Sequence, residues 1–209
     1  QGAKYKQVPD SLDFQLVRAK LRARLATPKE AVTDFESLLK DRKFANEGAT
    51  HYGLARAYLR ANNYAGVERE LGQLQKMKVS HAMVDNLTAD LRLAQKDVPG
   101  ALQVYRDGIK RYPFSRALAY GYGDTLLNNA QAREAQVFLE GQIQLYPQDS
   151  RLYTQVAKAY SLQGRAMQEH RALAESLALQ GRTEAAIEQL QLAQVAGDDP
   201  GNLGVAKDV

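Results

Sequence analysis

The 209-residue chain has no cysteine and no tryptophan, and it has only three histidines. The absence of cysteine excludes disulfides, thiolate metal ligands and a cysteine nucleophile. None of His51, His81 and His170 belongs to a His-Glu-x-x-His motif or lies within helical reach of another, so we expect each to be structural. A glycine-rich phosphate loop and a nucleophile elbow are also missing. The sequence therefore predicts no catalytic residue, no metal ligand and no cofactor in this chain.

Long apolar runs are missing as well. No run approaches the roughly 20 residues that cross a bilayer, so we expect no membrane span. The first residues have no signal-peptide core and no initiating Met, and the chain stops without a helix-ending signal, so we expect a mature chain or an excised fragment. Asp198 to Asn202 lacks the alternating ligands and final Glu of a calcium-binding EF-hand, so a plain turn is expected there.

The composition is that of a folded protein, with 44% hydrophobic and 25% charged residues. The net charge of +4 permits nucleic-acid binding, but the basic residues form no long runs. We therefore place a nucleic-acid or anionic-surface binder last among the functions considered.

A regular period runs through the middle of the chain. Pro113 and Pro147 each follow a Tyr and stand one period apart. Three classes of position share this period: a small residue, a second small residue twelve positions later, and a large residue after that. These positions are Ala55, Ala89, Gly123 and Ala157; Val67, Ala101, Ala135 and the exception Glu169; and Leu71, Tyr105, Leu139 and Leu173. A repeat of about 34 residues with two helices is typical of the tetratricopeptide repeat (TPR).

The pattern has a packing reason. Two antiparallel helices approach closely only where one presents a small side chain and the other a bulky one. Short polar turns separate the helices of each pair, and proline ends the second helix before the next repeat. The expected turns are 61–63, 95–97, 129–131 and 163–165.

The two ends depart from the period. At the N-terminal end, Phe14, Val17, Leu21 and Leu25 form a helical stripe, and about two extra residues lie between Lys40 and Glu47. At the C-terminal end, the Gln-Gly-Arg of 163–165 recurs after only half a period, at 180–182, so one helix over 166–180 serves two successive units. We predict an N-terminal extension (1–9), a repeat array (10–196) and a loop with a frayed tail (197–209). The predicted units are about 10–45, 48–79, 82–113, 116–147 and 150–181, followed by a unit over 166–196 that shares a helix.

The chain thus resembles the TPR family over about residues 10–196. The resemblance implies an all-α fold, a right-handed α-α superhelix of about eleven helices, with a concave groove lined by the first helix of each pair. Such grooves bind protein partners, and positions 5, 9 and 13 of each first helix should face the groove. These positions are Leu16, Lys20 and Arg24; Tyr52, Arg56 and Arg60; Asn86, Asp90 and Ala94; Tyr120, Asp124 and Asn128; and Thr154, Lys158 and Leu162.

The charges of these positions suggest a groove that is basic in the first two units and acidic at the centre, where Asp90 and Asp124 lie. The competing interpretation is that solvated helices carry such charges anyway. TPR proteins that grip chaperone C-termini have Asn at position 6, which this chain lacks, so that subclass is not expected. Position 6 is Val17, Gly53, Leu87, Gly121 and Gln155.

Two stretches narrow the resemblance. The first is Asp10 to Leu25 (DSLDFQLVRAKLRARL), and the second runs from LYTQVAKAY at 152–160, through HRALAE at 170–175 and LQGR at 179–182, to AAIEQL at 185–190. Together they resemble the C-terminal TPR region of BepA-type periplasmic zinc metalloproteases, the β-barrel assembly-enhancing family. This implies a periplasmic parent protein with a zinc metallopeptidase domain outside the chain. The implied partners are outer-membrane barrel-assembly components or unfolded barrel substrates.

The leading hypothesis is therefore a non-enzymatic docking region of such a protease, acting in outer-membrane protein assembly and quality control. The alternative is a free-standing TPR adaptor of a bacterial envelope or secretion assembly. A His-Glu-x-x-His motif encoded before Gln1 would distinguish the two.

Overall fold

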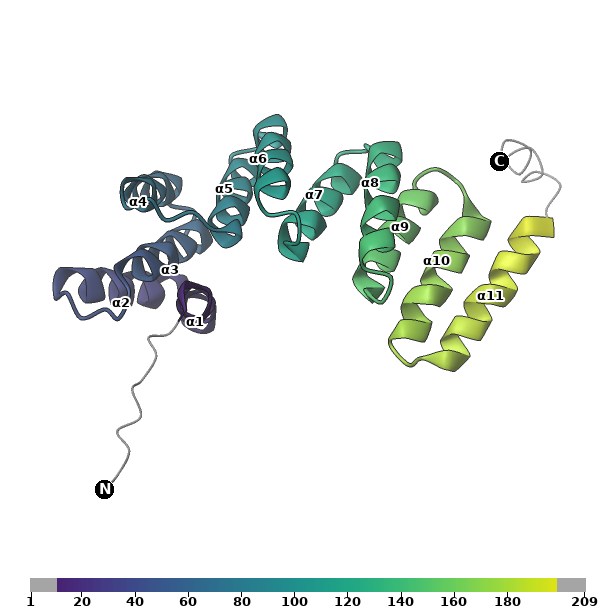
Figure 1. Ribbon diagram of the computed structural model, residues 1–209, viewed down its shortest axis with the longest axis horizontal. Coiled ribbons are helices and arrows are strands. Elements are labelled where there is room, and N and C mark those ends of the chain that lie inside the picture. The colour runs from purple at the N-terminus through teal and green to yellow at the C-terminus, as the bar shows by residue number, and fades with distance from the viewer. Residues whose placement is uncertain (1–10, 199–209) are drawn as a thin grey trace, which may run out of the picture. The chain divides into compact units, whose positions relative to one another are not determined.

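The computed structural model describes residues 11–198, which form eleven α-helices and no strand (Figure 1). This confirms the predicted all-α class and the number of helices. The helices are α1 (Leu12–Leu25), α2 (Pro28–Lys40), α3 (Glu47–Arg60), α4 (Tyr64–Lys76), α5 (Ala82–Ala94), α6 (Val98–Arg111), α7 (Arg116–Asn128), α8 (Ala132–Leu145), α9 (Ser150–Ser161), α10 (Ala166–Leu179) and α11 (Thr183–Asp198). None of these helices is long and apolar enough to cross a membrane.

The helices form two compact units, residues 1–108 and 109–209, with the boundary inside α6. In the first unit α3 packs against α1, α2 and α4, and α5 packs against α3 and α4. In the second unit α9 packs against α7, α8 and α10. Helix α10 packs against both α9 and α11, as expected for a helix that serves two successive pairs.

Local signals fix where the helices begin. The Ser11 hydroxyl caps α1, and Thr27 and Glu30 form a reciprocal capping box at α2, where Pro28 is the first helical residue. Asn46 and Asn63 cap α3 and α4 in the same way. Side-chain oxygens thus satisfy backbone N–H groups that the helix itself cannot pair.

The period of the repeat is visible in the backbone. Four turns between paired helices each contain one residue with a left-handed φ between 56° and 68°. They are Asn62, Lys96, Ala130 and Gly164, which recur with the period, and each is the middle residue of a predicted turn. Gly181, with φ of 74°, repeats the conformation half a period later. Only glycine adopts this conformation without steric cost, and Ala130 therefore carries strain.

Most of the small and large positions lie in the core, while Leu71 and Leu173 are half-buried. Ala55, Ala89 and Ala157 are buried, and so are Ala135 and Leu139 of the opposing helix class. A Cβ built on Gly123 would lie 2.9 Å from Leu139 Cδ2, which shows how closely the paired helices α7 and α8 approach. The exceptional Glu169 is half-buried.

The apolar stripe at the N-terminal end is exposed. Phe14, Val17, Leu21 and Leu25 lie on one helix, as predicted, and these side chains are 46% to 86% exposed. Helix α1 instead buries a face that includes Leu16 and small residues, because small side chains allow its close approach to α3. The predictions for residues 1–9 and 199–209 lie outside the described residues.

A loop was expected from residue 197, but residues 197 and 198 still belong to α11. A Cβ built on Gly197 would lie 2.9 Å from Met167 Sδ, so the last turn of α11 packs closely against α10. This tertiary contact extends the helix past the glycine at which the sequence indicates its end.

Candidate partner-binding site

In the first unit, position 5 of the repeat is buried rather than exposed. Leu16 and Tyr52, both expected to face a groove, are at most 1% exposed. Tyr52 lies on α3, and the contacts of α3 with α1, α2, α4 and α5 enclose its side chain. Burial raises the pKa of Tyr52 to about 12. These two residues therefore belong to the core, and the prediction that they face a partner is wrong.

Position 9 forms a polar row across α1, α3 and α5. The guanidinium of Arg56 pairs with the carboxylate of Asp90 at 2.6 Å, and both side chains are mostly shielded, at 22% and 30% exposure. Lys20 lies beside this pair: burial, and then the positive charge of Arg56, lower the pKa of the Lys20 amine. The Arg56–Asp90 pair joins α3 to α5.

The remaining predicted residues of this unit differ in environment. Arg60 donates hydrogen bonds to the carbonyls of Ala23 and Ala26, the latter at 2.8 Å, and so ties α3 to the end of α1. Arg24 is exposed in the last turn of α1, and Asn86 is half-buried on α5. Arg24 and Lys20 are the exposed predicted cations of this unit that lie outside these pairings.

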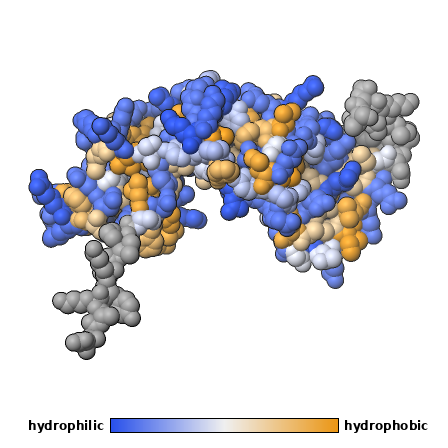
Figure 2. Space-filling view, in the orientation of Figure 1, coloured by the Kyte–Doolittle hydropathy of each residue, from blue (hydrophilic) through white to orange (hydrophobic). Residues whose placement is uncertain are grey.

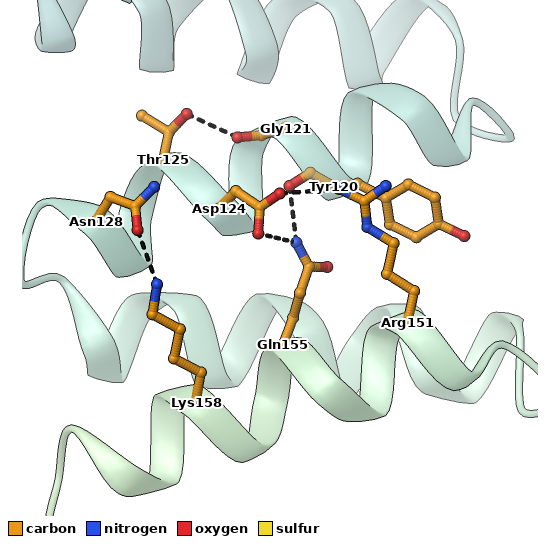
Figure 3. A network of polar contacts seen from close by, with 8 residues as sticks. All are labelled: Tyr120, Gly121, Asp124, Thr125, Asn128, Arg151, Gln155 and Lys158. Carbon is orange, nitrogen blue, oxygen red and sulfur yellow. Dashed lines mark hydrogen bonds and ion pairs between the residues drawn. The ribbon is translucent and has the colours of Figure 1, made fainter. Parts of the chain in front are cut away.

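In the second unit, Asp124 is the centre of a polar network between α7 and α9 (Figure 3). Its carboxylate pairs with the guanidinium of Arg151 at 3.0 Å and accepts a hydrogen bond of 2.6 Å from Gln155 Nε2. The same amide nitrogen donates to the carbonyl of Tyr120 at 2.9 Å. One glutamine thus fixes the spacing of two successive first helices.

Two further contacts flank this centre. The guanidinium of Arg151 lies 4.3 Å from the centre of the Tyr120 ring, a cation–π contact, while the Tyr120 hydroxyl donates to Asp149. Burial, followed by this hydrogen bond, raises the pKa of Tyr120 to about 12, so the hydroxyl stays a donor at neutral pH. At the other side, Lys158 Nζ donates to Asn128 Oδ1 at 2.8 Å.

This second network is open to solvent. The side chains of Arg151 and Asp124 are 56% and 45% exposed, and Asn128 and Lys158 are exposed as well. Gln155 is the buried member, and its Oε1 atom has no hydrogen-bond partner among the described residues. We call Asp124, Asn128, Arg151 and Lys158, with Gln155 beneath them, the α7–α9 polar face.

The proposed division of charge between a basic end and an acidic centre is offset in part by ion pairs. Within the first unit Arg56 pairs with Asp90, and within the second Asp124 pairs with Arg151. Lys20 and Arg24 lie outside these pairs and are exposed, so the division of charge stays a prediction.

Sequence reasoning missed two members of the α7–α9 polar face, Arg151 and Gln155. Asp124 contacts them, and they lie two turns and one turn before position 9 of α9. Both therefore follow Asp124 by less than one full repeat. Their i, i+4 spacing on one helix face was the available signal.

A pocket of about 340 Å³ also lies in the second unit, between α8, α9 and α10. Tyr153 and Tyr160 line it together with Ile143, and the Tyr160 hydroxyl donates to Glu140 at 2.5 Å. No sequence pattern indicated this pocket, because it depends on how α8 and α10 are placed around α9.

The histidines have structural partners. His51 contacts Glu70 at 2.6 Å, His81 contacts Asp13, and His170 contacts Gln189 at 2.9 Å. Across residues 11–198 no group of three or more His, Cys, Asp or Glu side chains is placed to hold a metal ion.

Residues 86–150 match the model of a tetratricopeptide repeat family, so this stretch carries TPR-type repeats, which are scaffolds for protein interaction. No curated protein matched the chain. Its fold is similar to that of several solved TPR structures, all of low sequence identity.

A TPR protein from Parabacteroides merdae aligns with a TM-score of 0.60 at 16% identity, covering 88% of this chain and 72% of that one. "MamA RS-1 ArsTM double mutant" aligns with a TM-score of 0.57 at 18% identity, covering 78% and 90%. YrrB, described as a TPR protein with an unusual peptide-binding site, aligns with a TM-score of 0.56 at 12% identity, covering 88% and 93%. These likenesses establish the TPR-type fold.

Proposed function

We propose that the chain is a scaffold that binds a protein partner on the α7–α9 polar face. The observation that carries the proposal is that its polar groups are exposed and yet held in place by one another across two helices. A surface whose side chains are already ordered loses less entropy on binding. YrrB offers a parallel for peptide binding by this fold.

The chemistry of the face favours a polar polypeptide segment. It offers a guanidinium and an ammonium group beside a carboxylate and an amide, so donors and acceptors alternate over a short distance. A polyanion would instead require unpaired cations. The pairing of Arg56 and Arg151 with carboxylates therefore argues against the nucleic-acid alternative.

At the finer level, we propose that this scaffold is the docking region of a BepA-type periplasmic zinc metalloprotease. The support is the resemblance of residues 10–25 and 152–190. In this proposal the zinc ligands belong to a domain outside the chain, and the chain binds barrel-assembly components or their unfolded substrates. The chain itself should be inactive, and zinc-dependent proteolysis by the purified 209-residue chain would contradict this.

The second candidate is a free-standing adaptor of an envelope or secretion assembly. Sequencing the coding region upstream of Gln1 separates the two. A His-Glu-x-x-His motif in the same reading frame supports the protease, and a reading frame without one supports the adaptor.

Site-specific photocrosslinking tests the binding face. A photoreactive amino acid at Asn128 or Lys158 should give the same adduct, and the matched position Arg133, exposed on α8, should not. Replacing Asp124 with Arg places like charges beside Arg151 and should remove the adduct. Equal adducts at Arg133, or adducts that survive Asp124→Arg, would overturn the proposal.

A further inference from the structure

Helix α1 presents an uncovered apolar stripe. Phe14, Val17, Leu21 and Leu25 recur at helical spacing and so lie on one side of the helix. All four are exposed, while the opposite side, with Leu16 and Ala19, is buried against the rest of the first unit. In a stacked array such a stripe is the surface on which another helix packs.

Helix α11 also exposes apolar side chains, which are interspersed with the exposed Glu184, Glu188, Gln191 and Gln194. Ala186 and Ala193 are buried, while Ile187, Leu190, Leu192 and Val195 are 47% to 71% exposed. Figure 2 shows hydrophobic surface over α1 and over α11. Terminal repeats of solenoid proteins usually carry a polar outer face that prevents further stacking, and α1 lacks one.

The two helices carry opposite charge. Arg18 and Arg24 flank the apolar stripe of α1. The helix also contains Lys20 and Arg22, and Asp13 is its single acidic residue. The α11 segment contains Glu184 and Glu188 and no Lys or Arg. Pairing α1 with α1, or α11 with α11, would place like charges together, whereas pairing α1 with α11 joins opposite charges.

We infer that α11 of one copy packs on α1 of a second copy, so that the chain associates head to tail. The lengths suit each other, since α1 has 14 residues and α11 has 16. Such a contact is heterologous: the pair of copies keeps one free α1 and one free α11, so association continues beyond the dimer. The inference goes beyond the proposed function, because it uses residues outside the α7–α9 polar face.

Two complementary variants of the whole chain test the inference. Leu21→Glu places a carboxylate in the α1 stripe, and Leu190→Glu places one on α11, so the two altered helices repel each other. Both sites are about half exposed, so the fold should be kept, which circular dichroism and the melting temperature verify. Leu145→Glu, at an exposed apolar residue of α8, is the matched control.

Sedimentation velocity over a concentration series is the measurement. The wild-type chain and Leu145→Glu should grow past the dimer mass as concentration rises, and the growth should weaken at high salt. Each α1 or α11 variant alone should be a monomer. Their mixture should stop at a one-to-one dimer, because it leaves one intact α11 and one intact α1.

Three results would overturn the inference. A wild-type chain that stays monomeric at all concentrations contradicts association. A single variant that still dimerises shows a symmetric or different interface, and a mixture that fails to form the dimer shows that α1 and α11 are not partners.

Discussion

The two units of the chain use the same repeat position for different purposes. In the first unit, Arg56 at position 9 of α3 pairs with Asp90 at position 9 of α5, one full repeat later. Both side chains are largely shielded from water. In the second, Asp124 reaches residues one and two turns earlier in the next first helix, and the pair remains half exposed. The shift from shielded to exposed pairing separates a structural contact from a surface that a partner can reach.

The close contacts between helices differ in a parallel way. A Cβ built on Gly53 in α3 would lie 2.4 Å from two atoms of the Phe35 ring, a rigid neighbour in α2. In the second unit, a Cβ on Gly123 meets Leu139 Cδ2 at 2.9 Å, the end of a flexible side chain. The first unit should therefore tolerate less change at its helix crossings.

The largest predicted effect tests this difference. Gly53→Ala should lower the free energy of unfolding by about 2 kcal/mol, because the Phe35 ring must move. Gly123→Ala should be nearly neutral, since the small shift of Leu139 is offset by the roughly 1 kcal/mol helix preference of Ala over Gly. Urea titration followed by circular dichroism measures both. Equal losses would remove the distinction between the units.

The next effect concerns the left-handed turn residues. Ala130→Gly should raise the free energy of unfolding by about 1 kcal/mol, because glycine adopts a φ of 59° without strain. Gly164→Ala, at the equivalent position one repeat later, should lower it by a similar amount. Thermal melts of the two variants should shift in opposite directions, and a shift of the same sign would contradict the explanation.

A smaller effect separates the two ion pairs. A double-mutant cycle on Arg56 and Asp90 should give a coupling of about 1 kcal/mol, because both side chains are shielded. The same cycle on Asp124 and Arg151 should give less than about 0.5 kcal/mol, since water screens the exposed pair. Alanine variants and urea midpoints at low and high salt supply the values. A larger coupling in the second unit would reverse the comparison.

The smallest effect is seen at alkaline pH. Burial raises the pKa of both Tyr52 and Tyr120 to about 12, but at Tyr120 the hydrogen bond to Asp149 adds to it. A group whose pKa is higher in the folded state stabilises the fold below its unfolded pKa and loses that contribution as pH rises toward the folded value. Stability should thus fall between about pH 10 and pH 12.

Ultraviolet absorbance of tyrosinate measures the two groups. Asp149→Asn should lower the pKa of Tyr120, because the carboxylate that opposes ionisation is gone, and should leave Tyr52 unchanged. Difference titrations against Tyr120→Phe and Tyr52→Phe assign the signals. An unchanged pKa of Tyr120 in Asp149→Asn would show that burial alone sets this pKa.

The repeat architecture could be predicted from sequence because it depends on local, periodic rules. Turns such as 129–131 and small positions such as Ala157 recur with the period, and the structure places both as predicted. The site was harder to predict, since it depends on which residues of adjacent helices face each other. Tyr52 carries a hydroxyl group suited to binding a partner, but it is buried inside the first unit. Gln155 has no distinguishing pattern in the sequence, but its amide joins α7 to α9.

The end of α11 was missed for a related reason, and the spacing of the α1 stripe alone did not show that the stripe is exposed. Glycine at 197 indicates a helix end, and an apolar stripe indicates a buried face, but tertiary packing decides both. Met167 holds the last turn of α11, and small residues of α1 take the inward face.

The central claim is that the exposed network of the second unit, rather than the shielded row of the first, binds the partner. Its most direct test compares the same reversal at the same repeat position, Asp124→Arg against Asp90→Arg, by the dissociation constant for the partner captured at Lys158. We predict about a tenfold loss of affinity, about 1.4 kcal/mol, for Asp124→Arg, and little change for Asp90→Arg beyond a lower melting temperature. An equal loss for both, or a loss for Asp90→Arg alone, would contradict the account.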